Sequence, residues 1–267
     1  MRNTPTASIF STTPRRTQRA ICGRDAIRYH VRQAARTIDT DRESVMSTFA
    51  TPRSATHPVD VTVEPALEGR NRLTTAFRFV LAIPHLLLVG GPIAGALSWT
   101  WRSDPNGDYQ GGLAGGVLGA VAAVCAFIAW FAILFTGRCP EGLWTLVAFY
   151  MRWRVRALAY TSLLRDEYPP FGDGEYPAAL VLRRPEGPRD RLTVAFRIFL
   201  AIPHLIVIWL LGIGWAVASV IAWFAILFTG RYPAGLYGFS VGVLRWATRV
   251  EAYLLLLHDD YPPFSLS

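Results

Sequence analysis

The sequence predicts an all-α integral membrane protein made of two tandem repeats, and three observations carry this prediction. The 267 residues are 52% hydrophobic and only 17% charged, whereas soluble domains carry about a quarter charged residues. The long apolar runs hold almost no charge. The decapeptide Ala-Trp-Phe-Ala-Ile-Leu-Phe-Thr-Gly-Arg occurs at residues 129–138 and again at residues 222–231. Each copy ends in a helix-stopping glycine and an arginine, as a membrane-spanning helix does at a charged interface.

Residues 1–56 are rich in Arg, Ser and Thr and show no apolar periodicity, which predicts a disordered extension. Many arginines with few acids are also typical of an organelle transit peptide. Met46 stands just before the first repeat. We therefore expect the native chain to begin at Met46.

The repeats occupy residues 57–171 and 176–264. Besides the decapeptide, Leu-Ala-Ile-Pro-His occurs in both, and agreement of this kind indicates internal duplication. Each repeat begins with a short β-prone stretch, at residues 59–63 and 179–182. We predict that these stretches form juxtamembrane strands that pair with one another on the membrane surface.

Each repeat is expected to contain a helical hairpin. In the first repeat, spans at 77–99 and 111–135 are separated by a polar, turn-forming loop. The second repeat lacks about 26 of these residues, so that its apolar run is about 33 residues long. One helix of that length would measure about 50 Å, against a hydrocarbon core of about 30 Å. We therefore predict spans at 194–211 and 213–229 with a turn near Gly212, and keep a single long tilted helix as the alternative.

A third segment follows each hairpin, at residues 143–164 and 236–257. Each carries two arginines four positions apart, which places both guanidinium groups on one side of a helix. Because arginine is costly in a spanning helix, we predict amphipathic helices lying in the interface. The two pairs are Arg152 with Arg156, and Arg245 with Arg249.

The distribution of arginine predicts the orientation. Residues 137–191 hold nine arginines, whereas the predicted 100–110 loop holds one. The positive-inside rule then places this segment and both termini in the cytoplasm of a bacterial plasma membrane. With four spans the repeats would be parallel. If the third segments also crossed, the repeats would be inverted, as in many transporters.

Pro84-His85 and Pro203-His204 fall within predicted spans. Proline frees a backbone carbonyl one turn earlier, and an imidazole in an apolar span needs a polar partner. The two histidines could form a proton relay or ligand pair between the repeats. Alternatively each bonds a freed carbonyl and holds the kinked helices together. We favour the second interpretation because neither span contains a carboxylate.

Six arginines are candidate lipid contacts. Arg138 and Arg231 directly follow a helix-ending glycine and are expected to anchor the spans at the headgroups. The Arg152/Arg156 and Arg245/Arg249 pairs could bind lipid phosphates. Alternatively they pair with the acids near the end of each repeat, namely Asp166, Glu167, Glu251, Asp259 and Asp260.

The chain has no recognisable enzyme signature, and its three cysteines and scattered histidines match no metal-site spacing. We therefore expect no enzyme, cofactor or metal. The net charge of +8 comes entirely from arginine and suits an anionic membrane surface rather than nucleic acid. The expected partners are anionic lipid headgroups together with a membrane protein or a second copy of this chain.

The duplicated Leu-Ala-Ile-Pro-His, the decapeptide and the Tyr-Pro-Pro-Phe that closes each repeat resemble the bacterial membrane-protein family called domain of unknown function 4389. The resemblance covers residues 57–264, and this chain departs from it by a Gly-rich insertion in the first repeat. It implies a membrane protein and supplies no activity. We predict a non-enzymatic membrane scaffold or accessory subunit, with a small transporter or channel that uses the paired Pro-His as the alternative.

Overall fold

The computed structural model describes residues 33, 57–91, 99–103, 109–113 and 115–266. The chain divides into two compact units, Met1–Thr48 and Phe49–Ser267, and every element discussed below belongs to the second. The extension predicted for residues 1–56, including the expected start at Met46, lies outside the described residues apart from Gln33.

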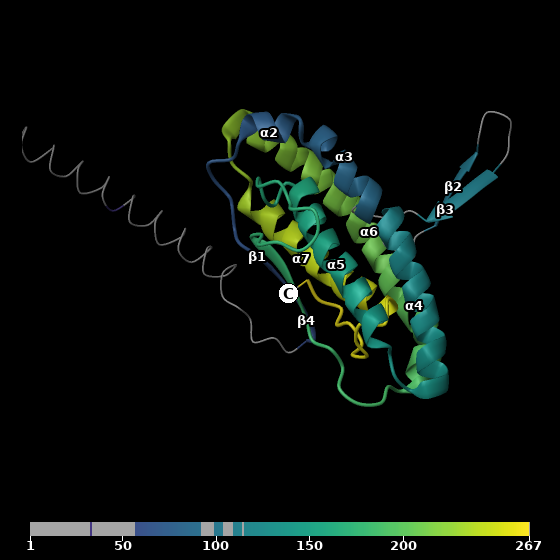
Figure 1. Cartoon of the computed structure of the whole chain (residues 1–267). Helices are drawn as coiled ribbons and strands as arrows, with labels where there is room; N and C mark the ends of the chain where they lie inside the picture. The colour runs from purple at the N-terminus through teal and green to yellow at the C-terminus, as the bar shows by residue number, and fades with distance from the viewer. Residues whose placement is uncertain (1–32, 34–56, 92–98, 104–108, 114, 267) are drawn as a thin grey trace, which may run out of the picture. The chain divides into compact units, whose positions relative to one another are not determined.

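The described elements are mostly helical, with two small antiparallel sheets (Figure 1). In chain order they are β1 (Val59–Val63), α2 (Arg72–Ala76), α3 (Arg78–Val89), β2 (Trp99–Ser103), β3 (Tyr109–Leu113), α4 (Gly116–Thr136), α5 (Glu141–Thr161), β4 (Ala178–Leu182), α6 (Arg191–Thr229) and α7 (Ala234–Leu254).

The two strands predicted at the repeat starts form and pair with one another. β1 and β4 are antiparallel, in a register that runs from Val59 opposite Leu182 to Val63 opposite Ala178. The three valines of β1 are buried, as expected for a strand with one face on the core. This pairing joins the beginnings of the two repeats.

The prediction of two short spans in the second repeat is wrong. α6 is one continuous helix of 39 residues, which was the alternative, and no turn forms near Gly212. A glycine inside a helix costs only about 1 kcal/mol, and here closer packing compensates for it. Gly212 is buried, and a Cβ on Gly214 would lie 3.3 Å from the Phe239 ring of α7. These glycines admit the neighbouring helix instead of ending their own.

The first repeat carries the same long helix in two pieces. α3 ends at Val89, so the span predicted at 77–99 is too long, and Trp99 belongs to β2. The predicted 100–110 loop contains a β-hairpin, and α4 begins at Gly116 rather than at 111. Gly116 has φ +75°, and a Cβ there would lie 2.6 Å from the Leu88 carbonyl. α4 therefore starts where α3 stops, and the intervening residues are an insertion into one helix (Figure 1).

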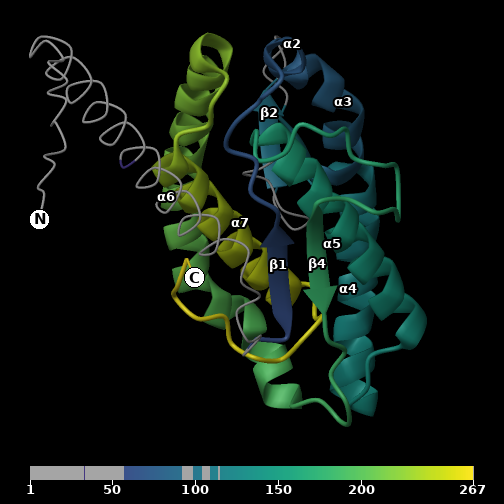
Figure 2. The same ribbon diagram turned by 90° about the vertical axis from the view of Figure 1, so that its left-hand side faces the viewer.

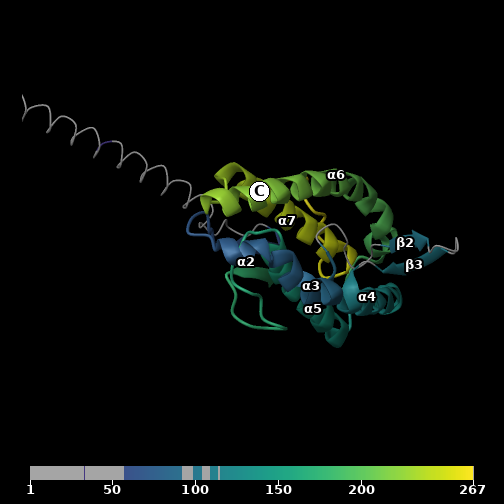
Figure 3. The ribbon, with the colours of Figure 1, turned by 90° about the horizontal axis from the view of Figure 1, so that it is seen from above.

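The two repeats are antiparallel, which corrects the expectation of parallel repeats. The backbone amide of Arg70 donates to the Gly230 carbonyl (3.1 Å), and that of Arg189 donates to the Gly137 carbonyl (2.9 Å). Each long helix thus begins beside the end of the other. The parallel arrangement depended on a turn in the middle of α6, and α6 has none. Figures 2 and 3 show α6 on one side of α7 and α3 with α4 on the other.

Two tryptophans lock this arrangement reciprocally. Trp130 of α4 donates from Nε1 to the Val194 carbonyl of α6 (3.0 Å), and Trp223 of α6 donates to the Thr75 carbonyl of α2 (2.9 Å). The two tryptophans occupy the same position in the duplicated decapeptide. The same side chain therefore makes the same contact twice, once in each direction.

α5 and α7 form the interior, contrary to the prediction of interfacial helices at 143–164 and 236–257. Most of their side chains are buried against one another, against the long helices and against the β1–β4 sheet. Leu146 is the sole large apolar side chain that is exposed among the residues of these two described helices. Their apolar sides are covered by the protein itself, so their hydrophobicity reflects the core and not a lipid surface.

Candidate functional site

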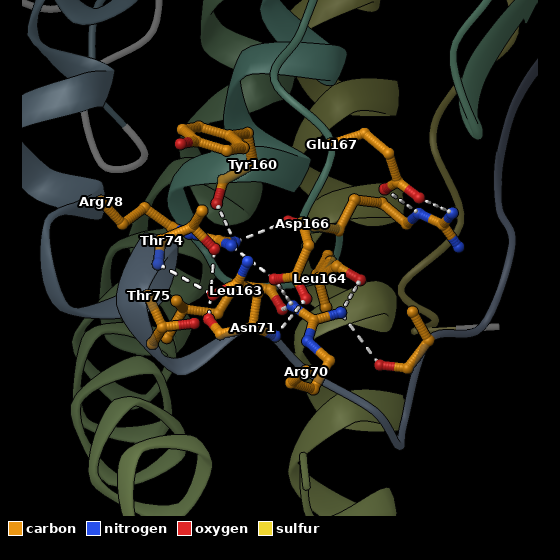
Figure 4. A network of polar contacts seen from close by, with 12 residues as sticks. Arg70, Asn71, Thr74, Thr75, Arg78, Tyr160, Leu163, Leu164, Asp166 and Glu167 are labelled. Atoms are coloured by element: carbon orange, nitrogen blue, oxygen red, sulfur yellow. Dashed lines mark hydrogen bonds and ion pairs between the residues drawn. The ribbon is translucent and has the colours of Figure 1, made fainter. Parts of the chain in front are cut away.

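A buried arginine cluster closes the first repeat at the end of α5 (Figure 4). Arg70 and Arg78 both form ion pairs with Asp166, the former at 3.0 Å. Arg78 also donates to the carbonyls of Tyr160 (3.1 Å) and Arg165 (2.5 Å). The carbonyls at the end of a helix have no partner within the helix and carry partial negative charge. The two guanidinium groups satisfy them.

The same cluster recurs at the end of α7. Arg189 and Arg197 pair with Asp259 at 2.7 and 2.6 Å, and Arg197 donates to the carbonyls of Tyr253 and His258. Burial alone would raise the pKa of the Asp259 carboxyl, but its bonds to Arg189 and Arg197 outweigh burial and hold that pKa below its usual value.

These four arginines were not among the sequence-predicted site residues, although the sequence contained a signal for them. Each stands at the same position of both repeats, Arg70 with Arg189 and Arg78 with Arg197. Leu163 and Leu256, which follow α5 and α7, also correspond and share an unusual positive φ of 65° and 63°. The Arg70 side chain bonds the Leu163 carbonyl, and Arg189 bonds the Leu256 carbonyl. Duplication had preserved the whole cluster.

The Pro-His motifs are packed separately, each inside its own repeat. Phe171 stacks on His85 with ring centroids 4.5 Å apart, and Trp153 donates from Nε1 to Nδ1 of His85 (3.1 Å). Phe264 likewise stacks on His204 at 3.9 Å. No described ring contact joins the two histidines. The Tyr-Pro-Pro-Phe segments thus cover the Pro84-His85 and Pro203-His204 motifs, and these contacts give the histidines a packing role. The expected bond to a freed carbonyl does not form at His204, because neither of its ring nitrogens has a hydrogen-bond partner among the described residues.

The paired arginines of α5 and α7 bind partners other than the predicted acids. Arg156 donates to the Gly172 carbonyl (2.7 Å), and Arg152 and Arg156 lie 3.6 and 3.9 Å from Asp173. In α7, Arg245 donates to the Val61 carbonyl (2.9 Å) and Arg249 to the Val59 carbonyl (3.4 Å) of β1. All four side chains are thus engaged within the protein.

Arg154, between the two predicted arginines of α5, has a role of its own. Its guanidinium donates to the carbonyls of Val89 (2.6 Å) and Gly91 (3.1 Å), where α3 is interrupted, and its Nε bonds Glu251 of α7 at 2.7 Å. Tyr150 also donates to Glu251 (3.2 Å). The residue that corresponds to Arg154 in the second repeat is Ala247, and α6 has no interruption to cap.

Arg138 lines a cavity of about 470 Å³ at the end of α4. The lining residues are Arg138, Cys139, Trp144, Arg184, Pro185, Glu186, Gly187 and Arg189. Arg184 pairs with Glu141 at 3.0 Å and lies over the Trp144 ring. Arg231, the counterpart of Arg138, is also exposed. Among the described residues, no group of three or more His, Cys, Asp or Glu side chains lies in position to hold a metal ion.

The outer sides of α3, α4 and α6 form an apolar surface. Two helices, α4 and α6, are long and apolar enough to cross a membrane, and only 39% and 22% of their most apolar windows are buried. Large exposed side chains of this apolar surface include Phe79, Val80, Leu87, Val124, Phe127, Phe135, Phe199, Ile206, Trp209, Val217, Phe224 and Phe228. A core helix of a soluble protein would instead be mostly covered.

Comparison with known protein families shows which family this chain belongs to. The family model described as "Domain of unknown function (DUF4389)" matches residues 112–172 and 191–265, which together make up about half of the chain. The chain belongs to this family. The two segments are consistent with tandem copies of the DUF4389 unit, and the first segment begins inside β3, where the insertion is ending. No curated protein and no solved structure matches the chain.

Proposed function

We propose that this DUF4389 protein is a non-enzymatic scaffold or accessory subunit of a bacterial plasma membrane, where it engages lipid and a partner protein. The apolar surface of α3, α4 and α6 is the observation that carries the proposal. Soluble monomers rarely expose apolar patches of more than a few hundred Å². Lipid chains would cover this surface without further protein.

The ends of the long helices support the same location. At one end, a Cβ on Gly230 would lie 3.6 Å from the Arg72 guanidinium, and Arg231 follows. At the other, a Cβ on Gly137 would lie 3.5 Å from the Arg191 guanidinium, and Arg138 follows. Arginines at the ends of apolar helices reach the headgroups while their stems stay in the apolar region.

The length of α6 implies a strong tilt. Its 39 residues correspond to about 58 Å at about 1.5 Å per residue, against a hydrocarbon core of about 30 Å. A helix that is too long for the bilayer tilts or extends beyond it. We therefore propose that α6 crosses obliquely and that its terminal turns lie in the headgroup region.

The interior of the molecule favours a scaffold over a transporter. The buried arginines are bound to carboxylates or carbonyls, and each Pro-His motif is enclosed by aromatic rings. A transport path built on the two histidines would require them to face a common cavity. The contacts place them in separate clusters, which supports a rigid body that presents its surface to partners.

Purification of the C-terminally tagged protein from its native membrane in mild detergent tests this proposal. We expect it to retain a membrane protein in stoichiometric amount, identified by mass spectrometry. The control is the purified protein alone in liposomes. Solute flux there, abolished by His85→Leu together with His204→Leu, would reject the scaffold in favour of a transporter.

A further inference from the structure

The duplication provides an internal comparison between the two ends of the long-helix pair. At the end of α6, the position that follows Arg231 is filled by Tyr232, which is buried and whose backbone amide donates to the Leu67 carbonyl (2.8 Å). Tyr237 is also buried and donates to the Glu64 carbonyl (3.1 Å). Two buried tyrosines and the partly buried Leu67 therefore lie beside this end.

At the end of α4, the corresponding residues leave a cavity. Cys139 stands in place of Tyr232, Trp144 in place of Tyr237, and Glu186 in place of Leu67. The cysteine is much smaller than a tyrosine, and Glu186 is exposed. All three residues line the cavity of about 470 Å³ described above. Of the three differences, Cys139 for Tyr232 is the one that removes most side-chain volume beside Arg138.

The charges at this cavity suit a phosphate group. No acidic side chain in the part of the chain that the structure describes forms an ion pair with Arg138. Arg184 forms an ion pair with Glu141, but the two side chains are 39% and 78% exposed. The pair is therefore weak, and an anion can displace Glu141. Arg189 is buried and bound to Asp259, and it forms a fixed wall. Arg138 and Arg184 therefore remain to donate to an anion, and guanidinium groups bind phosphate oxygens in pairs of hydrogen bonds.

The surroundings indicate which kind of phosphate. Phe135, three residues before Arg138, belongs to the apolar surface and is 77% exposed. Glu186 lines the same cavity and accepts hydrogen bonds from a hydroxyl or ammonium group. A phosphate ester with such a donor on one side and an apolar chain on the other would match the two arginines, Glu186 and the apolar surface at Phe135.

We infer that this pocket binds a phosphate ester, and that in the membrane this is the headgroup of a phospholipid. The lipid form of the inference rests on the proposed membrane location, whereas phosphate recognition by Arg138 and Arg184 does not. A soluble phosphate compound has the same binding chemistry, and the experiment separates the two sources.

The test uses the full chain in detergent, titrated with short-chain phosphatidylglycerol and, separately, with inorganic phosphate, and read by native mass spectrometry. Arg138→Ala should weaken phosphatidylglycerol binding about ten-fold or more, because a hydrogen bond to a charged group is lost. Arg231→Ala is the matched control, because it removes the equivalent arginine, which does not line this cavity, and it should leave binding unchanged. Cys139→Tyr with Glu186→Leu copies the closed end and should abolish binding.

Equal losses in Arg138→Ala and Arg231→Ala, or full binding by the filled-pocket variant, would overturn the inference. Binding of phosphatidylglycerol that inorganic phosphate does not displace supports a lipid headgroup. Binding of inorganic phosphate without the lipid supports a soluble ligand at the same arginines. Co-flotation of the wild-type chain with phosphatidylcholine vesicles, measured in parallel, reports on membrane location alone, so that the two proposals can fail independently.

Discussion

Arg154 shows how a single residue accommodates the insertion that separates the two repeats. The interruption of α3 leaves the Val89 carbonyl without a helical partner, and the Arg154 guanidinium supplies one at 2.6 Å. The charge of that guanidinium is balanced by Glu251, whose counterpart in the first repeat is Leu158. The second repeat has Ala247 in place of Arg154 and an unbroken helix. The capping residue Arg154, its counter-ion Glu251 and the insertion between α3 and α4 therefore belong together.

Arg154→Met should destabilise the protein by roughly 3–5 kcal/mol, because the mostly covered Glu251 carboxylate loses its ion pair with Arg154 and the Val89 and Gly91 carbonyls lose their donor. The double variant Arg154→Met with Glu251→Met should be clearly more stable than the single variant. Denaturant unfolding in detergent measures both. Arg152→Met is the control, because Arg152 is 31% exposed and its pair with Asp173 contributes at most about 1 kcal/mol. A double variant no more stable than Arg154→Met would contradict this account.

His258 makes stability depend on pH. Burial, reinforced by the nearby His57, lowers the pKa of His258 to about 3, and the two rings meet edge to face at 4.9 Å. The unfolded chain binds a proton at this histidine below about pH 6.5, while the His258 imidazole of the folded chain stays neutral. The unfolded state therefore takes up more protons as pH falls from about 6.5 towards 3, and stability is lost across that window.

Replacing His258 by Gln should flatten the upper part of this pH dependence. The thermal midpoint of the wild-type protein is expected to fall between pH 7 and about pH 5, and that of His258→Gln to fall less. The pKa of Asp259 is lowered as well, so its contribution is lost only at more acid pH and remains in the variant. Parallel wild-type and variant curves between pH 7 and 5 would show that His258 does not cause the loss.

At the scale of elements, we predict that the β2–β3 hairpin can be removed. Because Gly116 begins α4 beside the end of α3, deletion of residues 90–115 should join the two helices as in α6. The deletion removes the helix break that Arg154 caps. We therefore expect it to be tolerated best with Arg154→Ala and Glu251→Leu, a pair of substitutions that removes both charges of this ion pair together. The prediction is checked by size-exclusion chromatography and helix content in detergent. A deletion protein that is more stable with Arg154 and Glu251 retained would refute it.

The elements also show what the sequence could and could not predict. The pairing of β1 with β4 followed from their alternating, β-prone residues, and it formed as expected. The continuity of α6 did not follow, because glycines such as Gly212 and Gly214 occur both in turns and at places where two helices cross closely. The close neighbour of Gly214 is the Phe239 ring of α7, a contact with another element that the local sequence does not reveal. The carbonyl partners of Arg78 and Arg197 were hidden for a similar reason, because every residue carries a backbone carbonyl and the sequence does not mark which one is bound.

At the scale of the whole molecule, the polar and apolar groups are separated by layer. α5 and α7 hold the interior, the β1–β4 sheet packs on them (Figure 2), and α3, α4 and α6 carry the apolar surface. The antiparallel repeats place this surface on two sides of the molecule and place arginines at both ends of it. A duplicated unit has thus formed a single body whose large exposed apolar side chains lie mostly along the long helices.

Ile206→Arg tests this division directly. Ile206 lies in the middle of α6 and is 59% exposed, so a charge there should leave the packing intact but should cost roughly 2.5–3.5 kcal/mol in lipid. We expect a several-fold loss of protein from the membrane fraction after carbonate extraction. Val181→Arg is the matched control, because Val181 is 49% exposed on β4 and lies opposite Asp60, where a new arginine meets an acid. Unchanged retention of Ile206→Arg would mean that another protein and not lipid covers α6. Equal loss of both variants would mean that membrane binding does not distinguish the long helices from the sheet.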